Sequence, residues 1–275
     1  MTFSFEILSD TWGHLGESPV LSKDGHYLWW VDTEGWRLLR SHTGTGATET
    51  WQTPEIIGCI ALRDDGTLLA GLASGLFIFN PQTGLFQQAC SPETRNDMRF
   101  NDCALDPVGR FWAGTMHRDI TEPAGALFCV ERDLTHKRFF DGLWTPNGLA
   151  FDADRARMYF SDSHPSIQTI WVCDYDLASG NPSNKRVFAR TEHVEGRPDG
   201  AFVDDSGVYW IAGVGGSQIL RFAPTGDMLE PIPVPVTHPT KLVHQGDGLL
   251  ITTRRTAPAN VSDMSGHVLR ARRTD

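Results

Sequence analysis

The feature of this sequence that most restricts its fold is a unit that recurs six times along the chain. Each copy is a short apolar stretch, a turn with Asp-Gly or an equivalent, and a second stretch rich in Trp, Phe, Tyr and Leu. The six copies read ESPVLSKDGHYLWWVD, GCIALRDDGTLLAGLASG, NDCALDPVGRFWAGTM, NGLAFDADRARMYFSDS, DGAFVDDSGVYWIAGVG and TKLVHQGDGLLITT. Apolar stretches joined by a tight turn are typical of β-hairpins, and no long helical pattern competes with them. The sequence therefore predicts an all-β chain.

The spacing of the units indicates the architecture. Their turn positions are 41, 43, 46, 52 and 41 residues apart, at Gly25, Gly66, Gly109, Arg155, Gly207 and Gly248. A period of roughly 40 to 50 residues that reads as strands is typical of the four-stranded blades of a β-propeller. We therefore expect residues 1–275 to form a single six-bladed β-propeller domain. Because the ring must close, a terminal strand in 266–273 or in the first ten residues should complete a blade begun at the other end.

Composition and charge exclude several classes of partner. The 24 basic and 34 acidic residues give a net charge of −10, and no basic cluster interrupts the chain, so we expect no nucleic-acid binding. No apolar run approaches the roughly 20 residues that cross a bilayer, so we expect no membrane association and a cytoplasmic location. The cysteines show no metal-binding or disulfide spacing. We expect free thiols at Cys59, Cys90, Cys103, Cys129 and Cys173.

One position of the repeat carries polar side chains. The residues eight places before the turn positions are Glu17, Gly58, Asn101, Asn147, Asp199 and Thr240. Equivalent positions on the innermost strands face the channel at one level, so these six should form a ring. Two carboxylates and two amide oxygens there favour a divalent ion, Ca²⁺, Mg²⁺ or Mn²⁺, although such sites also take Zn²⁺ or Fe²⁺. The alternative is a channel whose polar residues only satisfy backbone groups or bind water.

The residues around Asn101 include a candidate for substrate binding. Arg99 lies two residues earlier, so on an extended strand it faces the same way, nearer the mouth, where its guanidinium could bind substrate oxygens. The same alternation continues the face of Asn101 through Cys103 and Leu105. It places Asp102 on the opposite face, where we expect a structural hydrogen-bond acceptor that ties adjacent loops together.

Other polar and aromatic residues are weaker candidates. Asp32 and Asp162 end second strands, where aspartates usually accept turn N–H groups. Glu122, in ITEPAGALF, could reach the mouth of the channel. Three histidines fall in loops that could rim the channel, namely His14, His117 and His164. Four tryptophans of second strands should fill space between blades, namely Trp29, Trp30, Trp112 and Trp210.

Five segments together resemble the signatures of the gluconolactonase/regucalcin (senescence marker protein) family. They are LGESPV, RFNDCALDPVGRFWAGTM, TPNGLAFDADRARMYFSDS, GRPDGAFVDDSGVYWIA and HPTKLVHQGDGLLITT, in the order of the family, from about residue 14 to 255. The resemblance implies a six-bladed propeller that binds one divalent metal ion in its channel. It also implies hydrolysis of a sugar lactone to the aldonic acid.

The resemblance assigns roles to particular residues. The metal ligands of the family fall on Glu17, Asn147 and Asp199, and its substrate contacts fall on Arg99, Asn101 and, more loosely, Glu122. In such a site the ion would polarise the lactone carbonyl, and we expect Asp199 to act as the general base for water. This chain departs from the family at Cys103, where a glycine is usual, which bears on the substrate more than on the chemistry.

Two other functions remain open from the sequence. One is a metal-dependent esterase or phosphotriesterase on the same fold. The other is a non-enzymatic calcium-binding propeller, in which the channel ion is only structural. The Arg99 guanidinium beside a site with open coordination positions favours the lactonase over both.

Overall fold

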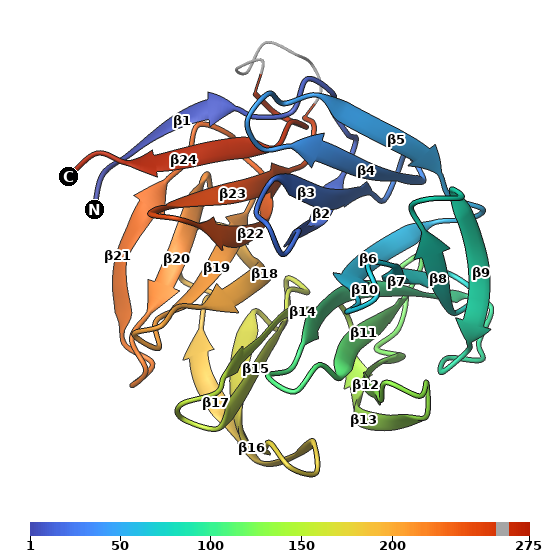
Figure 1. Cartoon of the computed structure of the whole chain (residues 1–275). Helices are drawn as coiled ribbons and strands as arrows, with labels where there is room; N and C mark the ends of the chain where they lie inside the picture. Colours follow the sequence, from blue (N-terminus) through green and yellow to red (C-terminus); the bar gives the residue numbers. More distant parts are fainter. Residues whose placement is uncertain (257–263) are drawn as a thin grey trace.

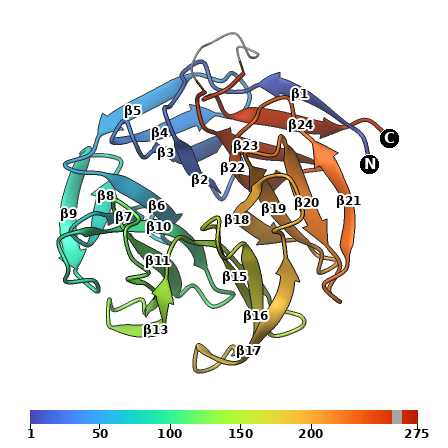
Figure 2. The same ribbon diagram turned by 180° about the vertical axis from the view of Figure 1, so that it is seen from behind.

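The computed structural model of the chain describes residues 1–256 and 264–275. In this part of the chain, 24 strands form six antiparallel sheets of four strands each, which stand as blades in a ring around a common axis (Figure 1). The view from behind shows the same closed ring (Figure 2). The predicted six-bladed β-propeller is therefore confirmed. Among the described residues we find no helix that is long and apolar enough to cross a membrane.

Each blade runs from an innermost strand to an outermost strand. The innermost strands are β2 (Gly16–Leu21), β6 (Ile57–Leu62), β10 (Met98–Leu105), β14 (Pro146–Asp152), β18 (Arg197–Val203) and β22 (Pro239–Gln245). The second strands are β3 (Tyr27–Asp32), β7 (Leu68–Leu72), β11 (Phe111–His117), β15 (Arg157–Asp162), β19 (Tyr209–Val214) and β23 (Gly248–Thr253). The third strands are β4 (Arg37–His42), β8 (Leu76–Asn80), β12 (Gly125–Val130), β16 (Thr169–Asp176), β20 (Gln218–Phe222) and β24 (Leu269–Arg273). The outermost strands are β5 (Thr48–Gln52), β9 (Leu85–Cys90), β13 (His136–Leu143), β17 (Asn181–Arg190), β21 (Met228–Pro233) and β1 (Phe3–Ile7).

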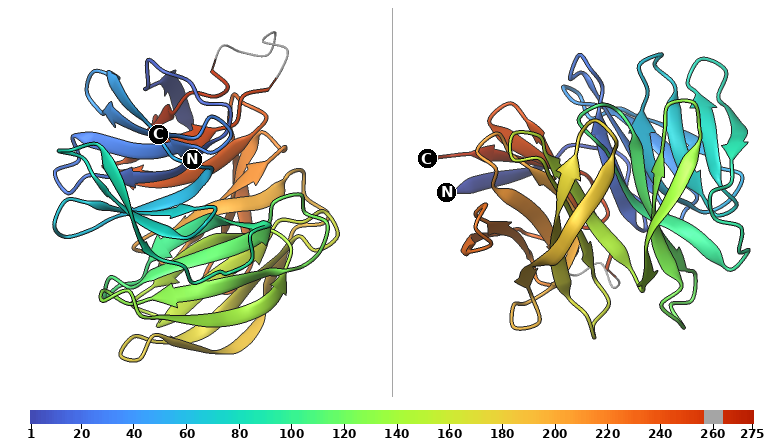
Figure 3. Two further views of the ribbon diagram at one scale, coloured as in Figure 1. Left: turned by 90° about the vertical axis from the view of Figure 1, so that its right-hand side faces the viewer. Right: turned by 90° about the horizontal axis from the view of Figure 1, so that it is seen from below.

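The ring closes through a blade built from both ends of the chain. β1 pairs antiparallel with β24, with Phe3 opposite Arg273 and Ile7 opposite Leu269. The two termini consequently lie side by side (Figure 3), and the amino group of Met1 is 3.5 Å from a carboxylate oxygen of Asp275. This confirms the expected completion of one blade by a strand from the other terminus.

The hydrophobic core is divided among the six gaps between neighbouring blades. Each gap holds one cluster of buried side chains, and the predicted tryptophans Trp29, Trp30, Trp112 and Trp210 belong to four different clusters. A fully buried large apolar side chain contributes roughly 1.5–3 kcal/mol, so closure of the ring is what makes each blade stable. All five cysteines are free, as predicted, and four of them are buried in these layers.

Candidate functional site

All six innermost strands are irregular at the level of the predicted ring. The register between the first and second strand of every blade shifts there, for instance between Glu17 and Val20 and between Asn147 and Ala150. A β-bulge of this kind inserts an unpaired residue and re-aims the side chains next to it. Gly148 has a φ of 64°, and a Cβ at that position would lie 2.4 Å from the hydroxyl oxygen of Tyr209. The bulges therefore place the polar residues in the channel.

The bulge makes two expectations about strand β10 wrong. The alternation that carried the face of Asn101 through Cys103 and Leu105 breaks between Phe100 and Cys103. Leu105 is exposed, whereas the Cys103 thiol is buried and donates to the backbone oxygen of Ile60 at 3.2 Å. An unpaired residue within a strand shifts all later side chains to the other face.

Arg99, Asn101 and Asn147 form one chain of hydrogen bonds across two blades. The Arg99 Nη1 donates to Asn101 Oδ1 at 2.8 Å, and Asn101 Nδ2 donates to Asn147 Oδ1 at 2.9 Å. Asn147 Nδ2 in turn donates to Ser163 Oγ at 2.5 Å. Each amide both donates and accepts, so its orientation is fixed, and Asn147 Oδ1 keeps a second lone pair for a ligand in the channel.

Glu17 and Asp199 form the acidic part of the site. Asp199 is buried and Glu17 is half-buried, and neither carboxylate has an ion-pair partner among the residues that the structure describes. Burial, followed by the charge of Asp102, raises the pKa of Glu17 to about 8. Burial, followed by the charge of Glu17, also raises the pKa of Asp199 well above its usual value. The two acids thus lie close enough to repel each other.

The donor set suits a hard divalent cation. A buried and a half-buried carboxylate that repel each other and lack a cationic partner are unfavourable unless a positive charge or a proton joins them. Asn147 contributes an amide oxygen that is already oriented, and oxygen donors of these types are the ligands that Ca²⁺, Mg²⁺ and Mn²⁺ prefer. The residues present therefore fit an ion held by Glu17, Asn147 and Asp199.

A buried ion pair that the sequence reasoning missed lies beneath this set. Lys241 Nζ donates to Asp102 Oδ1 at 2.5 Å and to the backbone oxygen of Cys103 at 2.7 Å. The backbone N–H of Leu149 donates to Asp102 Oδ2 at 2.9 Å. Burial alone would lower the pKa of Lys241, but the Asp102 carboxylate raises that pKa above its usual value. The only signal in the sequence was a lysine within the apolar strand TKLVH.

Asp102 is therefore a structural hydrogen-bond acceptor, as predicted, but its partners differ from those expected. It joins strands β10, β14 and β22 instead of loops. Its charge also acts on Glu17 and Asp199, so its side chain shares the channel with them. The expectation that it faces away from the channel is wrong, because the bulge puts two consecutive side chains, Asn101 and Asp102, on one side.

Glu122 lies apart from this set, at the rim. It belongs to the loop between β11 and β12 and pairs with Arg95 Nη2 at 2.5 Å, while the same nitrogen is 2.7 Å from Asp97 Oδ2. Ligand atoms of Asp97, His117 and Glu122 lie within 4.8 Å of one another. Because Arg95 already pairs with both acids of this group, we assign no cation to it. Contact of Glu122 with substrate stays a prediction.

The remaining candidates have structural partners. Asp32 Oδ1 accepts the backbone N–H groups of Leu15 and Gly35, and Asp162 accepts those of Trp144, Thr145 and His164, as predicted for both aspartates. The ring of His164 stacks on Trp144 with centroids 4.3 Å apart.

The fold and these residues define a class of protein, a six-bladed propeller with an oxygen-donor site in its channel. Comparison with known families is in agreement: residues 15–255 match the SMP-30/gluconolactonase/LRE-like region. The chain belongs to this family, and the predicted resemblance is confirmed.

Individual relatives cover most of the chain. A 6-deoxy-6-sulfogluconolactonase of Pseudomonas putida is 36% identical over 236 residues, which are 86% of this chain and 80% of the relative. An L-arabinolactonase of Azospirillum brasilense is 34% identical over 251 residues, 90% of this chain and 83% of the relative. The crystal structure of a calcium-binding protein, regucalcin, from Agrobacterium tumefaciens superposes with a TM-score of 0.91 at 24% identity, covering 98% and 93% of the two chains.

Proposed function

We propose that this chain hydrolyses a sugar lactone to the aldonic acid, with one divalent metal ion held by Glu17, Asn147 and Asp199. The observation that supports this most directly is a pair of acids without an ion-pair partner among the described residues, buried Asp199 and half-buried Glu17, whose charges act on each other. The oriented amide oxygen of Asn147 occupies the equivalent position of the repeat in the neighbouring blade. Two relatives at 36% and 34% identity are lactonases by name, which favours the same reaction class, a hydrolase of carboxylic ester bonds. When bound, such an ion polarises the lactone carbonyl and stabilises the charge that develops on its oxygen.

The basic and amide groups of the site bind and orient the substrate. Among the described residues, Arg99 donates only through Nη1, to Asn101 Oδ1 and to the backbone oxygen of Phe100. Its other nitrogens can donate to the hydroxyl groups of a sugar. Asn101 holds both Arg99 and Asn147 in place, and one lone pair of its Oδ1 remains for the substrate. Glu122 contacts the part of the sugar that reaches the rim.

Asp199 is the base in this proposal. It removes a proton from the water molecule whose oxygen forms the new bond to the carbonyl carbon. The ester bond between that carbon and the ring oxygen then breaks, and the proton passes to the ring oxygen. The product is an open-chain hydroxy acid, so all atoms of lactone and water are accounted for.

The test is a lactone assay after metal stripping and add-back of Ca²⁺, Mg²⁺, Mn²⁺, Zn²⁺ or Fe²⁺. Glu17→Ala and Asp199→Ala should each lower the metal-dependent rate by at least about a hundredfold. Glu230→Ala is the matched control, because this exposed glutamate lies on the outermost strand β21. Wild-type rates in both channel variants, in metal-stripped buffer, would contradict the proposal.

The same assay separates the two other functions. Faster turnover of aryl esters or phosphotriesters than of any lactone would identify an esterase of the same fold. A metal ion that raises the melting temperature without turnover of any substrate would identify a calcium-binding propeller.

A further inference from the structure

A second set of equivalent residues lies one level above the channel ring. The residues two places before the ring positions are Leu15, Ile56, Arg99, Thr145, Arg197 and His238. Side chains two residues apart on a strand face the same way, and the bulges begin only after these positions. Arg99 and Arg197 are therefore equivalent residues of blades three and five, and both face the route by which a substrate reaches the site.

Arg197 lies directly beside the proposed metal ligands. It is the first residue of β18, two residues before Asp199, and it is half-buried. Its Nη1 donates to the backbone oxygen of Ser163 at 3.4 Å, and Ser163 Oγ accepts the 2.5 Å hydrogen bond from Asn147. In residues 1–256 and 264–275, neither Arg99 nor Arg197 forms an ion pair with a carboxylate. Two guanidinium groups are thus left without anionic partners at the mouth.

With a divalent ion bound, the acids of the channel need no further cation. The ion would compensate Glu17 and Asp199, and Lys241 already pairs with Asp102 at 2.5 Å. Two rim acids are already paired with other arginines: Glu34 lies 2.9 Å from Arg254, and Glu122 lies 2.5 Å from Arg95. Arg99 and Arg197 then leave two positive charges at the mouth without an anion among the described residues. A neutral lactone supplies only one negative charge, the one that develops as its ester opens.

On this basis, and resting on the proposed lactonase function, we infer that the substrate carries a second anionic group, and that Arg197 binds it. The group is a carboxylate or a sulfonate at the end of the sugar remote from the ester. A guanidinium binds either anion through paired N–H donors, and its half-buried position strengthens the contact. Arg197 is then a residue that determines substrate specificity, while Arg99 remains with the sugar hydroxyls.

The test compares two lactones with the same ring, D-glucono-1,4-lactone and D-glucaro-1,4-lactone, which differ only in a terminal carboxylate. The wild-type protein should show a kcat/KM about tenfold or more higher for the anionic lactone, the size expected of one charge-assisted contact. Arg197→Met should abolish that preference mainly through KM, and Arg197→Lys should retain part of it. The control is Arg132→Met, in an exposed turn at the far end of the blades. A lactone with a terminal sulfonate shows which anion is preferred.

Calorimetric binding of the products, D-glucarate and D-gluconate, to the Ca²⁺-loaded protein gives a readout that needs no turnover. The wild-type protein should bind glucarate about tenfold more tightly, and Arg197→Met should bind both equally. Equal rates and equal affinities for the neutral and anionic compounds in the wild-type protein overturn the inference and leave the lactonase proposal intact. Absence of lactone turnover, with binding of glucarate that still depends on Arg197, overturns the lactonase proposal and supports the role of Arg197. If Arg197→Met does not fold, the wild-type preference and the Arg197→Lys variant decide.

Discussion

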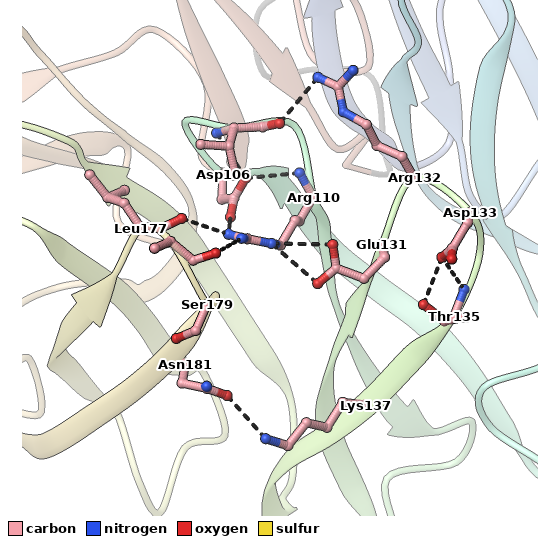
Figure 4. A network of polar contacts seen from close by, with 12 residues as sticks. Asp106, Arg110, Glu131, Arg132, Asp133, Thr135, Lys137, Leu177, Ser179 and Asn181 are labelled. Atoms are coloured by element: carbon pink, nitrogen blue, oxygen red, sulfur yellow. Dashed lines mark hydrogen bonds and ion pairs between the residues drawn. The ribbon is translucent and has the colours of Figure 1, made fainter.

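Buried charges are compensated differently in two regions, the channel site and a polar network at the other end of strand β10. Asp106, just beyond that end, pairs with Arg110 Nη1 at 2.8 Å and accepts the hydroxyl of Tyr175 at 2.6 Å. Arg110 also reaches Glu131 and the backbone oxygen of Leu177, so it joins blades three and four (Figure 4). In the channel, Glu17 and Asp199 have no such cation among the described residues.

This difference in compensation distinguishes charged residues that stabilise the fold from charged residues that are available to a ligand. In the Asp106 network the acceptors and donors meet inside the protein, so a ligand would add nothing. In the channel the same fold leaves two acids without a cation of the protein, to be neutralised by a proton or an added cation, although Lys241 compensates the neighbouring Asp102. Uncompensated acids in a concave, partly buried place are typical of sites that bind or react.

The largest expected effect comes from removing the compensating charge of the channel. Lys241→Met leaves Asp102 buried without its cation, so the free energy of unfolding should fall by about 3–5 kcal/mol. The divalent ion should bind more tightly, because one positive charge near Glu17 and Asp199 is gone. Urea unfolding and calorimetric metal titration measure the two effects, with Lys23→Met, an exposed lysine, as the control. Unchanged stability would show that the buried pair contributes nothing.

A slightly smaller loss is expected in the structural network. Arg110→Met leaves Asp106 with backbone and tyrosine donors, so we expect a decrease of about 3 kcal/mol in the free energy of unfolding. The same variant should keep its metal-dependent shift in melting temperature, since the network lies at the opposite end of the strand. Loss of metal binding in Arg110→Met would mean that the two regions are coupled and the comparison fails.

The third prediction concerns the ion itself. At a hundred times its dissociation constant, a divalent ion should raise the free energy of unfolding by about 2.7 kcal/mol. Asp199→Asn should abolish this increase, because the amide removes one anionic ligand while keeping the shape of the side chain. Melting curves at several Ca²⁺ or Mn²⁺ concentrations provide the measurement. An undiminished shift in Asp199→Asn would place the ion elsewhere.

The smallest effect is expected at Asp32. This acid lies near the channel mouth, but its carboxylate has partners inside the protein, like Asp106 in the structural network. Burial alone would raise the pKa of Asp32, but the Leu15 N–H and the Arg37 guanidinium lower it below its usual value. Its stabilising effect is therefore present above the unfolded pKa of about 3.9 and is lost as pH falls through the folded value. Asp32→Asn should cost about 1–2 kcal/mol at pH 7 and less at pH 3 in urea unfolding. An equal cost at both pH values would contradict the lowered pKa.

Much of the fold and part of the site followed from local sequence. The spacing of the six turns predicted the blades, and counting back from each turn found Asn101 and Asn147, which the structure joins by a hydrogen bond. Arg197 lies ten residues before its turn position, so a count two residues further back would have found it. Glu122 could not be placed this way, because its loop pairs it with Arg95, and loop shapes carry no repeat.

By itself, the sequence determined the number of blades and the free thiols, and it assigned Glu17, Asn147 and Asp199 to one equivalent position of the repeat. These depend on periodicity and composition, which act over a few residues at a time. Only the tertiary structure decided that Asp102 turns into the channel and meets Lys241, 139 residues further along the chain. A bulge depends on how neighbouring strands pair, and an ion pair across the channel depends on closure of the whole ring, so neither could be derived from one segment.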